Sequence, residues 1–297
     1  MDLRQLKTFQ VVATTLSFTQ AAVALGYVQS SVTAQIQSLE RDLGVHLFDR
    51  LGKKIKLTDA GERLLRYADQ LLALAEEART AVAGGEGVAG SLTISAPETI
   101  CTYRLPPVLQ EYRRRYPHVQ VVFKPSPVAD LRRLVAEGAL DVAFVLETPV
   151  GAPGLNVRPL VKEEVLVVAP ANHHLAGVDE VRAADLAGET ILFTGLGCCY
   201  RNLFERALIA GGVYPSTALQ FESVEAIKQC VITGMGIAAL PAVAVAKELT
   251  EGKLASLRWA DQPLSVVTQM VWHKDKWPSP AFQALVLLVE EVFHQFC

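Results

Sequence analysis

Hydrophobic positions in the first 45 residues recur every three or four places, which is the period of an amphipathic helix. Ser17, with Gln20 three residues later, resembles a capping box that opens a second helix. Gly26 then allows the positive φ of a sharp turn. The pattern therefore predicts three short helices, of which the last two form a helix-turn-helix. Their apolar faces consist of Leu3, Leu6, Phe9, Val12 and Ala13, then Ala21 and Ala22, then Val32, Ile36, Leu39 and Leu43.

The polar face of the third predicted helix carries side chains that are suited to reading DNA. Short hydroxyl and amide groups hydrogen-bond base edges or phosphates, and glutamine can pair bidentately with adenine in the major groove. An ordinary helical hairpin with a solvated surface is the alternative, and the basic hairpin that follows argues against it. The candidate DNA-binding residues of this helix are Gln29, Ser30, Ser31, Thr33 and Gln35.

A basic β-hairpin follows the third helix. The apolar segments 45–48 and 55–57 flank the sequence DRLGKK, whose glycine suits a tight turn. Cationic side chains at such a hairpin contact phosphates, which gives salt-dependent affinity and little sequence information. Residues 1–58 are thus predicted to form an all-α winged helix-turn-helix domain that binds double-stranded DNA. The wing residues expected to contact phosphate are Arg50, Lys53, Lys54 and Lys56.

Thr58 opens a long predicted helix that covers residues 59–84. Apolar residues recur along it at alternating spacings of four and three, which is the pattern of a coiled-coil seam. A glycine-rich hinge follows at 85–90, so a dimer contact is favoured over a helix that folds back onto its own domain. Dimerisation also suits DNA reading, because paired recognition helices match two half-sites. The seam residues are Leu64, Ala68, Leu71, Ala75, Ala78 and Val82.

Four segments of this N-terminal region resemble the LysR-type transcriptional regulators. They are SFTQAA at 17–22, QSSVT at 29–33, LERDLGVHLFDR at 39–50 and LTDAG at 57–61. The resemblance covers the first 84 residues closely and the rest by architecture. Val28 departs from the family pattern at the cap of the recognition helix, where Ser is common, and Ala34 stands where Arg is common. The first change should weaken the helix start, and the second removes one candidate DNA contact.

Beyond residue 90, short apolar strands alternate with helical patterns, which predicts parallel α/β sheets. The resemblance implies two α/β lobes like those of periplasmic solute-binding proteins, with a small-molecule effector between them. Residues 91–297 are expected to form this regulatory domain, with lobe I at 91–164 and 269–297 and lobe II at 165–268. The predicted strands are 91–95, 119–124, 141–146, 164–169, 191–194, 218–222, 236–240 and 265–272, and the predicted helices are 103–116, 127–138, 200–211, 223–234 and 278–296.

Loops that follow the predicted strands supply the candidate effector-binding residues, because α/β sheets bind ligands at the carboxyl ends of their strands. The loop after the first strand opens a helix whose N–H groups and hydroxyls suit an organic anion. Val128 stands where many family members have Ser or Thr, which leaves Ser126 as a weak substitute. Capping and loop-forming roles are the alternative for these residues. The candidates are Thr99, Ile100, Ser126, Cys198, Cys199 and Ser223, and no catalytic residue, metal ligand or cofactor is expected.

Charge is unevenly distributed along a chain whose net charge is only −3. Residues 1–58 carry seven Lys or Arg and four Asp or Glu, so this segment is +3 and the remainder is −6. A basic head on an acidic body suits a DNA reader that is joined to a sensor. No apolar run reaches the roughly 18 residues of a membrane helix, and the N-terminus lacks the layout of a secretory signal. A cytoplasmic protein without a membrane partner is therefore expected.

Cys198 and Cys199 lie in the segment GLGCCYR before a predicted helix and beside Arg201. Such a setting lowers a thiol pKa, so a thiol-based redox regulator is the second hypothesis. Peroxide-sensing LysR-type regulators resemble this region, with Cys199 at their reactive position, but Leu208 lies near their resolving position and forms no disulfide. The third hypothesis is a solute-binding or catalytic α/β protein. No GxGxxG, P-loop or GxSxG motif occurs and the histidines are scattered, so an enzyme is not expected.

The resemblance also implies how such a regulator works. It implies a homodimer through residues 59–84, a homotetramer through further pairing of the lobes, and RNA polymerase as a further partner. Effector binding would shift the population between two assembled states, which requires different effector affinities in the two states.

Overall fold

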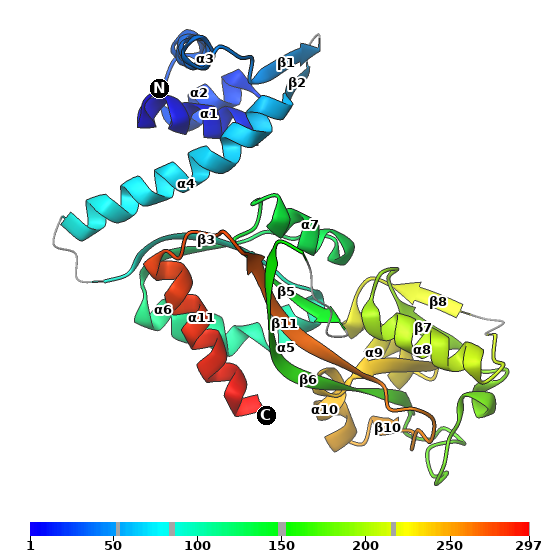
Figure 1. The fold of residues 1–297 in the computed structure, drawn as a ribbon. Coiled ribbons are helices and arrows are strands. Elements are labelled where there is room, and N and C mark those ends of the chain that lie inside the picture. The colour runs from blue at the N-terminus through cyan, green and yellow to red at the C-terminus, as the bar shows by residue number, and fades with distance from the viewer. Residues whose placement is uncertain (52–53, 83–86, 148–152, 215–217, 297) are drawn as a thin grey trace. The chain divides into compact units, whose positions relative to one another are not determined.

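The computed structural model describes residues 1–51, 54–82, 87–147, 153–214 and 218–296 (Figure 1). The chain divides into two compact units. The first unit consists of Met1–Ser91, His118–Gln120 and Ser279–Ala281, and the second consists of the remainder. In the described ranges, no helix is both long enough and apolar enough to span a bilayer.

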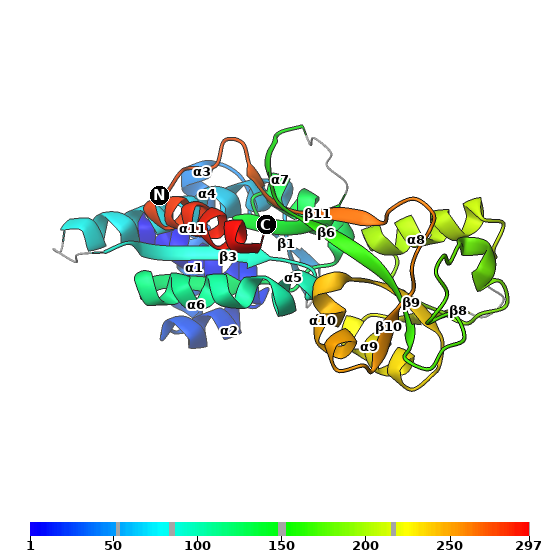
Figure 2. The same cartoon turned by 90° about the horizontal axis from the view of Figure 1, so that it is seen from below.

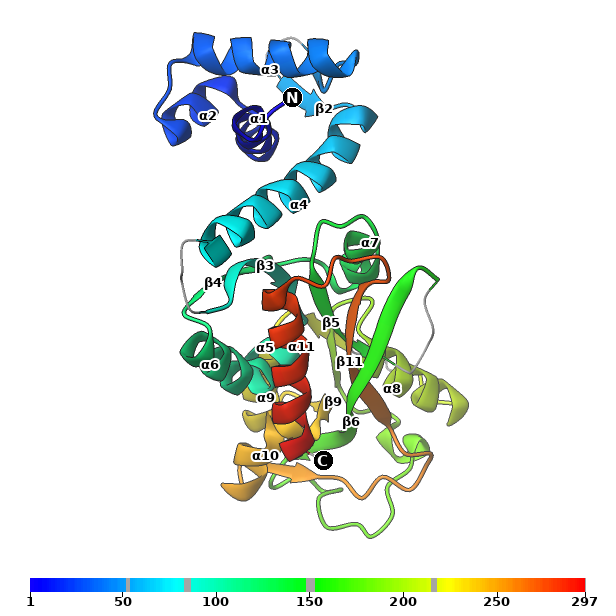
Figure 3. The same ribbon diagram turned by 60° about the vertical axis from the view of Figure 1, so that its left-hand side comes forward.

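The first unit contains the winged helix-turn-helix that the sequence predicts (Figure 3). The two strands of the wing pair antiparallel, with Phe48 opposite Leu57. Aromatic rings form the centre of the core, since Phe9 and Phe18 have their centroids 5.5 and 5.8 Å from that of Phe48. The elements are α1 (Leu3–Thr15), α2 (Phe18–Leu25), α3 (Gln29–Leu43), β1 (Phe48–Leu51), β2 (Lys54–Leu57) and α4 (Asp59–Val82).

Side-chain caps define the beginnings of three of these helices; at α4 the Thr58 hydroxyl accepts a hydrogen bond from the Gly61 amide at 3.0 Å. Asp2 and Gln5 form a complete capping box at α1, which the sequence analysis did not identify. At α2 the Ser17 hydroxyl accepts a hydrogen bond from the Gln20 amide at 3.3 Å. The N-cap of α3 is Val28, which provides no side-chain hydrogen bond, so the first N–H groups of the helix lack the side-chain acceptor that a Ser would give.

The first turns of α4 pack against the core of the first unit. Leu64 and Ala68 belong to that core and Ala68 is fully buried, so these two positions of the predicted seam contact the helix's own unit. The prediction of a continuous dimer seam was therefore wrong at its beginning. Part of the predicted hinge, residues 85–86, lies outside the described residues. Among the side chains of α4 that the structure describes, the large exposed apolar ones are Tyr67 at 62%, Leu71 at 39% and Leu74 at 46%.

The second unit is an α/β structure built around a nine-stranded sheet with the order β4-β3-β5-β11-β6-β9-β7-β8, in which β10 also pairs with β6. Its strands are β3 (Ala89–Ser95), β4 (His118–Phe123), β5 (Val142–Glu147), β6 (Leu155–Pro170), β7 (Ile191–Thr194), β8 (Ala218–Phe221), β9 (Ile237–Pro241), β10 (Leu254–Ser256) and β11 (Ser265–His273). Its helices are α5 (Glu98–Tyr103), α6 (Leu105–Arg115), η1 (Val128–Asp130), α7 (Leu131–Ala136), η2 (Ala183–Leu186), α8 (Cys199–Ala210), α9 (Val224–Ile232), α10 (Ala242–Thr250), α11 (Pro280–Phe293) and η3 (His294–Phe296).

The sheet is mixed, so the expectation of purely parallel sheets was wrong. β3 and β5 are parallel, as are β7 with β8 and with β9, but β6 and β11 run antiparallel to their neighbours. The reason is that β6 carries the chain out of one half of the sheet and β11 brings it back. Their pairing with each other extends from Leu155 opposite His273 to Glu164 opposite Ser265.

β6 changes partners along its length and so divides the second unit into two lobes. Up to Glu164 it pairs with β11, and from Val165 it pairs with β9. We call residues 165–264 the second lobe and the rest of the second unit the first lobe. The sequence-based boundary at 268/269 falls at a register shift inside β11. In the second lobe, α8 lies on one face of the sheet and α9 with α10 on the other (Figure 2).

The structure contains elements that the sequence analysis omitted or merged. The first part of β6 was not predicted, because Arg158, Pro159 and Lys162 interrupt its apolar pattern. The helix α10 was not predicted either, since its alanine-rich sequence directly follows a strand. The helix expected at 103–116 is α6, and the short helix α5 precedes it; the two meet at Arg104, where α6 has proline in its first turn.

Candidate functional site

The start of α3 presents the predicted DNA-reading side chains. Gln29, Ser30 and Ser31 are exposed, in the first turn of the helix. Gln29 accepts a hydrogen bond from the Thr19 hydroxyl on α2 at 3.1 Å, which positions its amide. Thr33 is half-buried and its hydroxyl donates to the Gln29 carbonyl at 3.0 Å, so part of its bonding capacity is used within the helix.

Gln35 points toward α1. Its side-chain oxygen accepts a 2.7 Å hydrogen bond from the hydroxyl of Thr8, which is buried. The exposed face of α3 continues instead through Ala34, Gln37 and Arg41. The sequence analysis missed Gln37 and Arg41, although they lie seven and eleven residues after Ser30, a spacing that keeps them on one helix face.

The wing is a two-stranded hairpin in which Arg50 pairs with Ile55 and Lys56 with Asp49. Lys56 is exposed, as a phosphate contact requires. Lys53 lies outside the described residues, as do the side chains of Arg50 and Lys54. Arg50 and Lys54 are therefore placed only by the course of the two strands.

Thr99 of the first lobe and Tyr200 of the second lobe lie next to each other. Thr99, in the first turn of α5, is 4% exposed, and its hydroxyl oxygen lies 3.5 Å from that of Tyr200, in the first turn of α8. α5 follows β3 and α8 follows β7, so both residues lie beyond the carboxyl ends of strands, as predicted. Ile100 is fully buried and belongs to the core.

A second approach between the lobes involves the loops near Ser126 and Cys198. A Cβ added to Gly197 would lie 3.9 Å from the Cβ of Ala129 in η1. Ser126, three residues before Ala129, is half-buried, and its hydroxyl donates to the Lys124 carbonyl at 3.2 Å. Ser126 is thus near the boundary between the lobes, with its hydrogen engaged in its own loop.

Cys198 is the N-cap of α8 and Cys199 is its first residue, and both are half-buried. A hydrogen bond from the Cys199 thiol lowers the pKa of Cys198. Burial raises this pKa, but further hydrogen bonds from the surrounding residues also lower it, so the net shift is downward. The same hydrogen bond, together with burial, raises the pKa of Cys199. The more acidic thiol is therefore Cys198, and not the residue that the family resemblance places at the reactive position.

Ser223 caps α9 and contacts a carboxylate from the other lobe. Its hydroxyl donates to Glu98 Oε1 at 2.9 Å, and the Val224 amide donates to Glu98 Oε2 at 2.8 Å. The beginning of α9 is a favourable place for an anion, and here the chain's own Glu98 takes that place. The sequence analysis predicted Ser223 as an effector contact and did not anticipate this partner, which lies 125 residues away.

A buried lysine lies beside this contact. The Lys228 ammonium on α9 is 2.8 Å from Glu225 and 2.9 Å from Glu248 on α10. It also lies 5.6 Å from the centre of the Tyr103 ring on α5, and the Tyr103 hydroxyl donates to Glu225 at 3.4 Å. This cluster therefore joins α5 of the first lobe to α9 and α10 of the second. One local signal for this cluster is present in the sequence, a Glu225–Lys228 pair at helical spacing within an apolar stretch.

Two buried polar atoms near the ends of the first-lobe strands have no hydrogen-bond partner among the described residues. They are the hydroxyl of Ser95, the last residue of β3, and the side-chain oxygen of Gln269 on β11. Gln269 lies opposite Val145 near the end of β5. Unpaired buried polar groups are costly, so they are candidates for bonds to a ligand or to ordered water.

A separate groove of about 580 Å³ runs beside β6, β10 and the beginning of β11. Its polar lining includes Lys162, Glu164 and Arg258. It contains none of the residues predicted to bind an effector, so it does not coincide with the candidate effector site.

Comparison with known proteins assigns both units. Residues 3–62 match the model of the bacterial regulatory helix-turn-helix protein, lysR family, and residues 85–294 match the LysR substrate binding domain. The HTH-type transcriptional regulator YwqM of Bacillus subtilis (strain 168) is 42% identical over 295 residues, which cover 99% of this chain and 100% of YwqM.

Two solved full-length structures show the same fold at lower identity. OxyR from Pseudomonas aeruginosa has a TM-score of 0.74 at 22% identity, with 99% of this chain and 95% of OxyR covered. LysG from Corynebacterium glutamicum, with bound effector Arg, has a TM-score of 0.70 at 22% identity, with 99% of each chain covered.

Proposed function

The chain belongs to the LysR family of bacterial transcriptional regulators, and from that premise we propose that a small polar molecule bound between its two lobes controls its action on DNA. The family match makes the protein a DNA-binding transcriptional regulator with an effector-binding domain. The match favours a regulator over the alternative of a solute-binding or catalytic protein with an incidental helical domain.

The approach of Thr99 to Tyr200 is the observation that carries the proposal. Two hydroxyls from different lobes lie 3.5 Å apart, so a ligand that bonds to both would favour one arrangement of the lobes over others. The unpartnered oxygens of Ser95 and Gln269 add hydrogen-bonding capacity on the first-lobe side. Neutral hydroxyl and amide groups of this kind suit a small polar molecule, and an organic anion stays the predicted class.

The position of Glu98 limits where an anionic effector could bind. Because its carboxylate already bonds to Ser223 and Val224, an anionic effector would have to displace it from α9 or bind elsewhere. The candidates for direct contact are therefore Thr99, Ser126 and the loop that contains Cys198 and Cys199. We propose that Ser223 acts through the Glu98 contact between the lobes.

The DNA-binding part of the proposal uses the exposed start of α3 for base contacts and the wing for phosphate contacts. Gln29, Ser30 and Ser31 are proposed to read bases, and Lys56 with the other basic wing residues to bind phosphates. Assembly into a homodimer or homotetramer would place two such heads on two half-sites. A cytoplasmic location and a contact with RNA polymerase belong to the same proposal.

A thermal-melt screen of the reduced full-length protein against amino acids, small carboxylates and aromatic acids tests the effector site. At a hundredfold excess over Kd a ligand stabilises the native state by about 2.7 kcal/mol, which raises the midpoint by about 5–10 °C. Thr99→Val removes one hydroxyl without changing shape and should weaken binding about three- to tenfold.

Thr250→Val is the matched control, because Thr250 is exposed on α10 and bonds only within its own helix, to the Ala246 carbonyl. A ligand whose binding falls in the Thr99 variant and not in the control supports the site. A ligand that stabilises both variants as well as the wild type would place the effector elsewhere.

Thiol-based sensing is the second candidate, and the lowered pKa of Cys198 favours it. Position 208, where a resolving cysteine would lie, holds a leucine that is buried in α8, so peroxide would first convert the Cys198 thiolate to a sulfenic acid with release of water, without a disulfide to that position. Alkylation followed by mass spectrometry, before and after mild peroxide, should then show Cys198 protected first. Full alkylation of Cys198 and Cys199 after peroxide would exclude this mode.

A further inference from the structure

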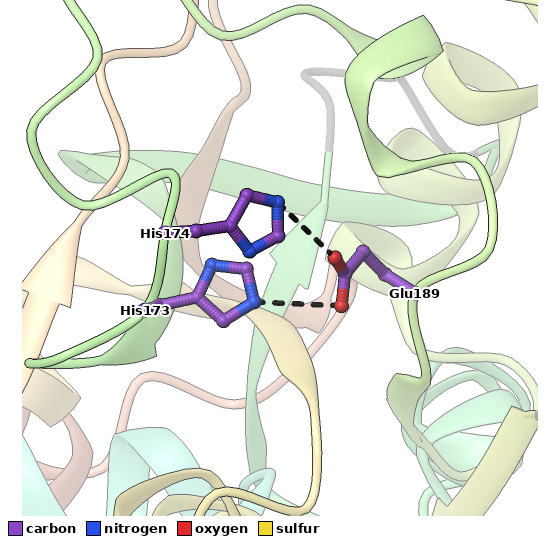
Figure 4. A group of neighbouring side chains, drawn as sticks. All are labelled: His173, His174 and Glu189. Atoms are coloured by element: carbon purple, nitrogen blue, oxygen red, sulfur yellow. Dashed lines mark hydrogen bonds and ion pairs between the residues drawn. The ribbon is translucent and has the colours of Figure 1, made fainter.

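Two histidines and a glutamate converge in the second lobe (Figure 4). His173 and His174 lie in the turn after β6, and Glu189 lies in the loop between η2 and β7. His173 Nε2 is 3.4 Å from one oxygen of the Glu189 carboxylate, and His174 Nε2 is 3.6 Å from the other. The candidate ligand atoms of all three residues lie within 4.8 Å of one another. Two separate loops thus direct nitrogen and oxygen donors at one point.

These separations match the coordination shell of a transition-metal cation. Zn²⁺ binds histidine nitrogen and carboxylate oxygen at about 2.0–2.2 Å, so neighbouring ligands of a tetrahedral shell lie about 3.3–3.5 Å apart. The nitrogen–oxygen distances, 3.4 Å to one carboxylate oxygen and 3.6 Å to the other, are close to that edge length, and one ligand atom from each residue lies within 4.8 Å of the others. Two imidazoles and a carboxylate form a donor set that suits Zn²⁺ and its neighbours and leaves a fourth position for water.

Backbone hydrogen bonds hold both loops in place. The His173 amide donates to the Pro170 carbonyl at 3.0 Å, and the Glu189 amide donates to the Leu186 carbonyl at 3.1 Å. The side chains of His173 and Glu189 are 14% and 24% exposed, whereas that of His174 is 67% exposed. Two of the three donors are therefore fixed by their surroundings, and the third closes the site from the solvent side.

The two imidazole rings lie close enough to share one cation. Their centroids are 4.4 Å apart, and each Nε2 lies beside an oxygen of the same carboxylate. A divalent cation uses both imidazoles in their neutral form. In the structure, His173 Nδ1 accepts a hydrogen bond from the Leu175 amide at 3.3 Å. If Nε2 of His173 coordinates the cation, the ring proton lies on Nδ1 and this weak hydrogen bond is lost.

We infer that His173, His174 and Glu189 form a binding site for a divalent transition-metal cation of the Zn²⁺ class. The site is separate from the proposed effector site, since it joins the end of β6 to the loop that enters β7. A bound cation would cross-link these two loops and stabilise the second lobe whether or not an effector is present. The sequence analysis expected no metal, because the two histidines and Glu189 form no recognisable ligand motif.

The test uses the full-length reduced protein, stripped of metal with a chelator and titrated with ZnCl₂ and CoCl₂. One equivalent of Zn²⁺ per chain should raise the thermal midpoint by mass action. The Co²⁺ protein should show ligand-field absorption without the intense band of thiolate-to-metal charge transfer, because the proposed donors include no cysteine. Saturable binding with that spectrum supports the site.

Variants localise the cation. His174→Ala removes a ligand that is 67% exposed and supports no core, and Glu189→Gln keeps the side-chain size, so each should weaken Zn²⁺ binding at least about tenfold in a folded protein. His46→Ala is the matched control, because His46 is 88% exposed and lies in the wing domain. Unchanged affinity in the first two variants, a thiolate band with Co²⁺, or no saturable binding would each overturn the proposal.

Discussion

Lys228 is buried between two carboxylates, and removing its charge should be far more damaging than removing an exposed lysine charge. Its side chain is 5% exposed, and that of Glu248 is 11% exposed. Burial lowers the pKa of Lys228, but its hydrogen bonds with Glu225 and Glu248 outweigh burial and raise the pKa above its usual range. The hydrogen bond with Lys228 also lowers the pKa of Glu225.

Replacement of Lys228 by Met keeps most of the side-chain shape and leaves the Glu248 carboxylate without its cation. Glu248 Oε2 has no hydrogen-bond partner among the described residues, so the carboxylate would lose its hydrogen bond from Lys228 and keep a longer-range attraction to Lys253. Breaking a buried pair in this way costs about 3–5 kcal/mol of unfolding free energy. A second change, Glu248→Gln in the same chain, removes the carboxylate charge and should recover most of the loss.

The pH dependence has a defined sign. The raised pKa of Lys228 contributes stability that is present below its ordinary value of 10.5 and is lost as the pH rises through the folded value. The lowered pKa of Glu225 contributes stability that is present above 4.5 and is lost as the pH falls through the folded value. The difference between wild type and Lys228→Met should therefore be largest between these limits.

Urea denaturation, followed by circular dichroism near neutral pH, measures these differences. Lys247→Met is the matched control, because the Lys247 side chain is 79% exposed and lies 3.9 Å from Glu251, a pair worth less than about 1 kcal/mol. The reasoning is refuted if Lys228→Met is as stable as this control, or if the double variant with Glu248→Gln is no more stable than Lys228→Met alone.

Three further predictions concern the first unit. Val28→Ser supplies the missing cap of α3 and should raise the unfolding free energy of the first unit by about 0.5–2 kcal/mol in urea denaturation. An unchanged unfolding free energy would contradict the capping argument. Gly61→Ala puts a Cβ in overlap with the Leu47 carbonyl oxygen and should cost about 1–3 kcal/mol in thermal melts, whereas a neutral result would mean that α4 does not approach the wing this closely. Lys56→Ala should reduce the slope of log K against log salt by about 0.9 in anisotropy titrations with operator DNA, and an unaltered slope would exclude a phosphate contact.

Local signals were sufficient to predict the first unit. The apolar periodicity around Phe9 and Ile36, the cap at Ser17 and the turn at Gly26 all act within a few residues, and each appears in the structure. Gln35 was predicted less well, because its side chain bonds to a residue of another helix. Its type suits an adenine contact, but the buried Thr8 hydroxyl of another helix determines where the side chain points.

The second unit was less predictable because its key contacts join distant parts of the chain. Nothing near Ser223 indicates that Glu98 will bond to it, and nothing near His173 indicates that Glu189 will face it. The unpredicted beginning of β6 has the same explanation. This segment is a strand because its backbone pairs with β11, which lies about a hundred residues later in the chain. The strand therefore forms although its side chains lack the apolar pattern from which strands are usually predicted.

The pairing of Glu164 with Ser265 makes the whole second lobe an insertion between two residues that lie opposite each other. The Val165 amide also donates to the Leu264 carbonyl at 2.9 Å, so the two chain crossings run side by side. A two-residue Asn-Gly turn from Glu164 to Ser265 would convert β6 and β11 into an ordinary hairpin. The second lobe is thus an inserted module, and a different module whose termini lie equally close together is compatible with the same first lobe.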